Sequence, residues 1–143
     1  MKEFPFYKQV TNKDCGITCL RMIAKYRGKS SDILTRKGLK KADNSGISLL
    51  QLKTNADLIG IKTFASRVPV NYLAKINLPL ILHWNRNHFV ILFEVVKNSY
   101  HIADPARGIL ALTQLELISH WKDDEYTNID GGIVLGFFDS EYE

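Results

Sequence analysis

Cysteine is scarce in this chain of 143 residues, which contains only Cys15 and Cys19. Two cysteines are too few for a structural zinc site or for the disulfide framework of a small secreted protein. On a helix, their spacing of four places both on one side, but too far apart along the axis for an easy disulfide bridge. We therefore expect two free thiols and a reducing compartment.

The chain also lacks an apolar run long enough to cross a bilayer, which takes about 20 residues. Its longest apolar stretches are residues 78–84 and 89–93. At the N-terminus, Phe-Pro-Phe-Tyr at residues 4–7 replaces the unbroken apolar run of a signal peptide. A Gly-rich phosphate loop is missing as well. We expect a single cytosolic domain spanning residues 1–143 that holds no cofactor and no metal.

Acidic residues are few in the first half of the chain. Residues 1–67 carry 14 Lys or Arg against 5 Asp or Glu, whereas residues 68–143 carry 5 against 10. A basic half can bind nucleic acid. However, Lys37, Lys40 and Lys41 are not interleaved with stacking aromatics, and no nucleic-acid-binding motif is present. A solvated basic surface is the simpler interpretation, so we expect no nucleic-acid partner.

The pattern of the first half predicts helices. An amphipathic run opens at one helix-capping residue and stops at a glycine, and Ser48 with Gln51 has the spacing of a capping box. The expected helices run from Asp14 to Gly28, from Ser30 or Ser31 to about Gly38, and from Ser48 to Gly60.

The second half reads as short strands that are separated by turn residues. The expected strands are Ile61–Ala65, Leu80–Trp84, Phe89–Val96, Tyr100–Ala103 and Ile133–Phe138. Thr113 with Glu116 caps a late helix of about two turns. Helices followed by a mostly antiparallel sheet predict an α+β fold.

The strongest chemical signal surrounds Cys15, which lies at the expected start of the first helix, one residue after Asp14. A helix N-terminus favours a thiolate, because unpaired N–H groups and the helix dipole stabilise negative charge there. Gly16 leaves room for a substrate backbone to approach. Gln9, six residues upstream, can place its side-chain amide beside the thiol. Together with the Cys15 backbone N–H, it would hold the oxyanion of a tetrahedral intermediate.

A catalytic cysteine needs a base, and His88 begins a predicted strand with its ring at the strand end. Sixteen residues later, Asp104 ends the next strand across the expected hairpin. Neighbouring strands place these two ends side by side, where the carboxylate can orient one imidazole nitrogen and leave the other facing Cys15. The expected catalytic set is therefore Gln9, Cys15, His88 and Asp104.

These residues carry a family resemblance that spans most of the chain. The segment from Gln9 to Gly16, the block from Leu80 to Leu92 and the turn from Asp104 to Gly108 occur in the family's order. The chain resembles the N-terminal peptidase domain of bacteriocin-processing ABC exporters, a papain-like family that cleaves double-glycine leader peptides. The family's cysteine, histidine, aspartate and oxyanion glutamine fall on Cys15, His88, Asp104 and Gln9.

The resemblance also implies a substrate and a larger parent protein. The substrate would be the precursor of a secreted peptide, whose helical leader lies in a shallow apolar groove and ends in Gly-Gly inside a narrow cleft. Trp84 is a candidate wall of that cleft, with a core aromatic as the alternative. Membrane-spanning and nucleotide-binding domains of an ABC exporter would follow residue 143, and this domain would lie on the cytoplasmic side of the bacterial membrane.

Several residues have simpler interpretations. Asp14 reads as a helix cap, and Cys19 as a core residue one turn into the helix. His83 is expected to be structural, pointing to the opposite side of its strand from Trp84. Surface or structural positions are also expected for His101 and His120.

Two other functions remain open at this point. One is a different Cys-His-Asp enzyme on a papain-like frame, such as an amidase, a cell-wall peptidase or an acyltransferase, which should not prefer Gly-Gly. The other is a docking module that binds leaders without cutting them. The presence of Cys15 argues against the docking module.

Overall fold

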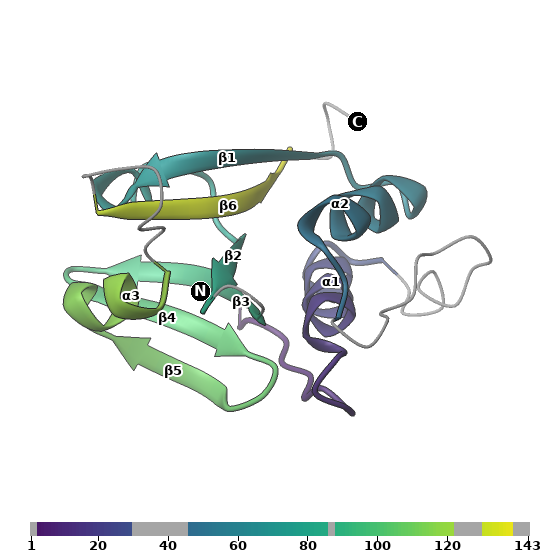
Figure 1. The fold of residues 1–143 in the computed structure, drawn as a ribbon, viewed down its shortest axis with the longest axis horizontal. Helices are drawn as coiled ribbons and strands as arrows, with labels where there is room; N and C mark the ends of the chain where they lie inside the picture. Colours follow the sequence, from purple (N-terminus) through teal and green to yellow (C-terminus); the bar gives the residue numbers. More distant parts are fainter. Residues whose placement is uncertain (1–2, 30–45, 86–87, 122–129, 139–143) are drawn as a thin grey trace.

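A computed structural model describes residues 3–29, 46–85, 88–121 and 130–138 of the chain (Figure 1). In chain order, the helices are α1 (Cys15–Tyr26), α2 (Leu49–Leu58) and α3 (Gln114–Trp121), with a short 3-10 turn at Val70–Tyr72. The strands are β1 (Thr63–Pro69), β2 (Leu80–Trp84), β3 (His88–Val96), β4 (Ser99–Asp104), β5 (Gly108–Leu112) and β6 (Gly131–Phe137).

The strands form one sheet in the order β1-β6-β2-β3-β4-β5, and every pairing between neighbours is antiparallel. Two helices therefore precede an antiparallel sheet, and the predicted α+β class is confirmed. None of the helices within the described residues is long and apolar enough to span a membrane.

Local sequence signals explain where the helices begin. Ser48 and Gln51 form the predicted capping box, because each side chain bonds the other's backbone N–H. The same reciprocal pair of bonds joins Thr113 and Glu116 ahead of α3. Both predicted caps are confirmed. The short helix expected to end near Gly38 lies outside the described residues.

Apart from shifts of one or two residues at other strand ends, two features of the sheet differ from the sequence prediction. The first strand runs over Thr63–Pro69 rather than Ile61–Ala65, because Ile61 packs into the core ahead of the strand. Strand β5 was not predicted. Its residues alternate between half-buried and exposed, as expected for an edge strand that pairs only with β4. The turn at residues 104–107, directly before β5, concealed this short alternation.

The sheet separates two cores. Helix α1 packs against β3, and α2 packs against α1 and β1, whereas α3 packs against β2, β4, β5 and β6. Because successive strand residues face opposite sides, β2 contributes to both cores. Ile81 lies in the first core with α1 and α2, while Leu80, Leu82 and Trp84 lie in the second core.

Candidate active site

Helix α1 begins at Cys15, which is a free thiol with a side chain that is 5% exposed. Asp14 occupies the N-cap position, and its carbonyl accepts the first helical bond from the Thr18 N–H. Its carboxylate, however, makes no capping bond to the helix. Asp14 Oδ2 instead accepts a bond of 3.1 Å from the Thr11 backbone N–H. Asp14 is therefore the N-cap residue of α1, as expected, but its side chain does not cap the helix.

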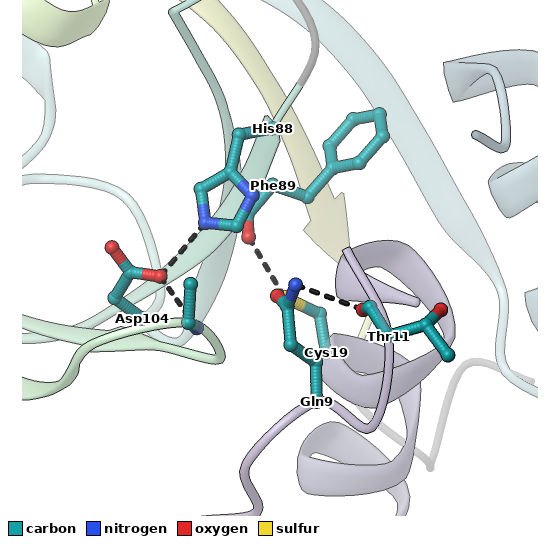
Figure 2. Close-up of polar contacts among 7 residues, drawn as sticks. Gln9, Thr11, Cys19, His88, Phe89 and Asp104 are labelled. Atoms are coloured by element: carbon teal, nitrogen blue, oxygen red, sulfur yellow. Dashed lines mark hydrogen bonds and ion pairs between the residues drawn. The ribbon is translucent and has the colours of Figure 1, made fainter. Parts of the chain in front are cut away.

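The structure brings His88 and Asp104 together at neighbouring ends of β3 and β4. His88 Nε2 lies 2.7 Å from Asp104 Oδ1 (Figure 2). The Cys15 side chain lies close enough to the His88 ring to raise its pKa. The imidazole therefore bridges the thiol of α1 and a carboxylate of the sheet, in the order expected from the sequence.

The two partners decide the charge of His88. Burial alone lowers the pKa of an imidazole. Hydrogen bonds to Asp104 and Cys15, together with the negative charges of both groups, outweigh burial and raise the His88 pKa from 6.5 to about 9. His88 is therefore an imidazolium at neutral pH. It can stabilise a Cys15 thiolate and later release its proton.

Asp104 is almost fully buried, with 2% of its surface exposed. Burial by itself raises the pKa of a carboxyl group. Hydrogen bonds from His88 and from the Ala106 N–H (2.9 Å), together with the charges of His88 and Arg107, outweigh burial and lower the Asp104 pKa. The carboxylate thus stays ionised and orients the imidazole.

Gln9 reaches the same site through the N-terminal segment. Its backbone N–H donates to the carbonyl of Pro105, directly after Asp104, at 2.9 Å. Its side-chain Nε2 donates to the carbonyl of Thr11 at 2.9 Å (Figure 2). Within the described residues, Gln9 Oε1 is the one buried side-chain polar atom without a hydrogen-bond partner.

Cys19 lies one turn further along α1 and is fully buried, as expected for a core residue. Its Sγ donates to the backbone carbonyl of Phe89 at 3.4 Å (Figure 2). Burial, followed by the negative charges of Cys15 and Asp104, raises the pKa of Cys19 well above its usual value. Cys19 therefore remains a protonated donor that links α1 to β3, one residue beyond His88.

The structure buries both residues that were predicted to contact substrate. Trp84 is only 2% exposed and lies in the second core, with its ring stacked on His120 at 4.9 Å. It packs beneath α3, whereas Cys15 belongs to the first core. Gly16 is also buried, and a Cβ at this position would lie 2.5 Å from Cγ2 of Ile47. Gly16 therefore allows close packing at the start of α1.

The remaining histidines have structural partners that the sequence pattern did not reveal. His101 Nδ1 lies 2.8 Å from Glu94 Oε1, and His120 Nδ1 lies 3.2 Å from Asn85 Oδ1. The ring of His83 stacks on Phe89 in the first core, opposite to Trp84 as expected. The Glu94–His101 pair could have been recognised once the β3–β4 register was known, because the two residues are direct partners.

The arrangement is suited to nucleophilic acyl transfer. The imidazolium of His88 lies between the Cys15 thiol and the buried Asp104 carboxylate. The side-chain amide of Gln9 lies beside them. Over the described part of the chain, no group of three or more His, Cys, Asp or Glu side chains is placed to hold a metal ion.

Comparison with known proteins identifies close sequence relatives. The model of the peptidase C39 family matches residues 3–126. The colicin V secretion/processing ATP-binding protein CvaB of Escherichia coli is 32% identical over 116 residues, which cover 81% of this chain. The probable microcin-H47 secretion/processing ATP-binding protein MchF of the same species is 33% identical over 107 residues, which cover 75%. The chain spans 17% and 15% of these two relatives.

Solved structures share the fold over nearly the whole chain. A double glycine motif protease from an AMS/PCAT transporter, solved in complex with the leader peptide, superposes with a TM-score of 0.77 and 25% identity. The alignment covers 94% of this chain and 91% of that protease. The peptidase domain of Streptococcus ComA superposes with a TM-score of 0.80 at 19% identity, covering 94% and 98% of the two chains.

Proposed function

Because the chain belongs to the peptidase C39 family, we propose that it is a cysteine endopeptidase that removes double-glycine leader peptides from bacteriocin-like or other secreted peptide precursors. Family membership agrees with the resemblance drawn from the sequence. The observation that carries the proposed activity is the His88 ring, which lies 2.7 Å from Asp104 and close enough to Cys15 for the two side chains to interact. This arrangement supports a nucleophile, a proton carrier and an orienting carboxylate.

In the proposed reaction, the Cys15 thiolate attacks the carbonyl carbon of the second glycine. A C–S bond forms, and the carbonyl electron pair moves onto oxygen. When the tetrahedral intermediate collapses, the C–N bond breaks and His88 gives its proton to the leaving amine. Water then attacks the thioester and loses a proton to His88. The second intermediate collapses with cleavage of the C–S bond, so the leader leaves with a new carboxyl group that ionises in solution, and the thiolate–imidazolium pair is restored.

Gln9 is proposed to stabilise the negative oxygen together with the Cys15 backbone N–H. An amide nitrogen carries two N–H groups, and the Thr11 carbonyl uses one of them. The second N–H remains for the oxyanion. Such donors act on charge that exists mainly in the transition state, and losing one typically lowers kcat by roughly 10²- to 10³-fold.

The relatives support a proposal for the substrate and the partners. The described relatives are secretion and processing ATP-binding proteins, and one similar protease was solved with its leader peptide. We propose that a leader peptide binds this domain and that the parent chain continues into the membrane and nucleotide-binding domains of an ABC exporter. The domain would then act at the cytoplasmic face of the bacterial membrane.

A test of the proposal compares four substrates by kcat/KM. They are a full leader substrate, a short peptide that keeps only the Gly-Gly junction, and leader substrates with Ala at either glycine. A cleft that closes around bare backbone excludes a Cβ. One added methyl group should then cost about 1–3 kcal/mol, which corresponds to roughly a 5- to 150-fold loss.

The same experiment separates the alternatives. The short peptide should also be cut poorly, because a diglycine offers too little surface to hold a peptide without the leader helix. Equal rates on all four substrates would instead identify a general amidase or peptidase. Leader binding without cleavage of any of the four would identify a docking module.

A further inference from the structure

We propose that Asp14 is a positioning residue for the oxyanion donor. In this view, its carboxylate holds the turn from Thr11 to Asp14, and the Thr11 carbonyl in turn fixes the side-chain amide of Gln9. The inference rests on the proposed function, because it assigns Asp14 a role in the acyl-transfer site. It also explains why a carboxylate at the N-cap position makes no bond to the helix that it precedes.

The turn is closed by bonds in both directions between the same two residues. The Thr11 backbone N–H donates to Asp14 Oδ2 at 3.1 Å, and the Asp14 backbone N–H donates to the Thr11 carbonyl at 3.2 Å. The Lys13 N–H adds a bond of 3.3 Å to Thr11 Oγ1. Asp14, the residue directly before the nucleophile, therefore anchors both the amide and the carbonyl of Thr11.

The Thr11 carbonyl is also the acceptor for Gln9 Nε2, at 2.9 Å (Figure 2). A carbonyl oxygen only accepts hydrogen bonds, so the Gln9 amide must present its nitrogen to Thr11. Turning the amide over would bring two oxygens together. The position of the Thr11 carbonyl therefore determines which way the Gln9 amide faces.

The surroundings of Gln9 show that this orientation needs support. Gln9 Oε1 is buried and, within the described residues, has no hydrogen-bond partner. An unsatisfied buried acceptor is unfavourable, so the amide would turn if nothing held its nitrogen. The backbone of Gln9 is held separately, because its N–H bonds the Pro105 carbonyl at 2.9 Å. Asp14 and Thr11 thus complete the placement of an amide whose main chain is already tied to the Asp104 turn.

The inference is tested by a double-mutant cycle on the full leader substrate, with the variants Asp14→Ala, Gln9→Ala and the combination of both. We expect Asp14→Ala to lower kcat by roughly 5- to 10-fold with KM unchanged, since a slightly misplaced donor still binds substrate. In the Gln9→Ala background, Asp14→Ala should cause no further loss. If the two losses multiply, Asp14 does not act through Gln9 and the inference is overturned.

Two matched variants separate geometry from charge and from general effects on the loop. Asp14→Asn keeps an acceptor oxygen but removes the charge, so it should stay within about 2-fold of wild type if geometry matters. Asn12→Ala alters an exposed residue of the same turn and should leave kcat unchanged. An Asp14→Asn enzyme as slow as Asp14→Ala would mean that the charge is responsible, and the inference would fail.

Alkylation of Cys15 by iodoacetamide provides a readout that needs no oxyanion. Its rate should be the same in wild type and in Asp14→Ala, whereas a slower rate in the variant would place the effect on the nucleophile and overturn the inference. The cycle should also be measured with the p-nitrophenyl ester of N-acetylglycine. If wild type cleaves this ester but leaves the leader substrate intact, the proposed function fails while the cycle still decides the role of Asp14.

Discussion

The two sides of the sheet differ in the chemistry that they bury. On the side of α1 and α2, the core contains both thiols, and Cys19 bonds the backbone of β3 directly. On the side of α3, the core consists of aliphatic and aromatic side chains, including Trp84 and Trp121. The indole N–H of Trp121 donates to the Ile133 carbonyl at 3.0 Å, which ties α3 to β6.

This comparison suggests that one side of the sheet serves the reaction and the other serves stability. The α1 side supplies the nucleophile, the end of β3 supplies the histidine that interacts with it, and the end of β4 supplies the aspartate that holds the histidine. The α3 side holds the sheet in shape but contributes no member of the candidate catalytic set. Substitutions near α1 should therefore change the reaction more than the stability, whereas substitutions beneath α3 should do the reverse.

The largest effect is expected from Cys15→Ala. The variant loses the nucleophile, so cleavage of the leader substrate should fall by roughly 10⁴-fold or more. Folding and leader binding should persist, because one small side chain at the start of α1 is changed. Activity assays with circular dichroism and leader-binding titrations measure both parts. Loss of activity on alkylation of Cys19, with Cys15 unmodified, would contradict the assignment.

The second effect concerns the base and its partner. His88→Ala should be about as damaging as Cys15→Ala, and Asp104→Ala less so, because a residue that only orients its partner contributes less than the nucleophile. His101→Ala is the matched control, since His101 pairs with Glu94 instead. An inactive His101→Ala or His83→Ala enzyme beside an active His88→Ala enzyme would mean that the wrong histidine was chosen.

A pH dependence should follow from the raised His88 pKa of about 9. A group whose pKa is higher in the folded than in the unfolded state stabilises the fold below its unfolded pKa, and this contribution is lost as pH rises through the folded pKa. Stability should therefore decline between about pH 6.5 and pH 9, by on the order of 2–3 kcal/mol.

Urea unfolding of wild type and His88→Ala across this range measures that contribution. The wild-type curve should fall with rising pH, and the difference between the two proteins should shrink toward pH 9. The rate of cleavage should fall over the same upper range, because a neutral His88 no longer carries the proton for the leaving amine. Parallel stability curves for the two proteins would show that His88 does not titrate in this window.

The smallest effect on the reaction is expected from Leu117→Ala in α3. Leu117 is fully buried in the second core, so removing its side chain should cost about 2–5 kcal/mol of stability. The kcat/KM of the folded fraction should stay within about 3-fold of wild type. A large loss of kcat/KM well below the melting temperature would show that the α3 side takes part in the reaction and would break the comparison between the two sides.

Local patterns were sufficient for much of this protein. The start of α1 at Cys15, the capping box of Ser48 with Gln51, and the strand ends that carry His88 and Asp104 were all recognisable from residue types at short spacings. Such features depend on contacts within a few residues or on the pairing of consecutive strands. Such features can be predicted from the sequence. The order of the motifs also led to the correct family.

Only the tertiary structure shows which residues pack against or bond a given side chain. Alternation along β2 places Trp84 opposite His83 but does not say that α3 covers the Trp84 side. A glycine after a cysteine suggests open space, yet Ile47, from a segment far along the chain, fills it. An aspartate before a helix suggests a side-chain cap, yet the carboxylate of Asp14, at the N-cap position, accepts a bond from Thr11 instead. In each case the residue's role depends on a partner that only the folded backbone brings within reach.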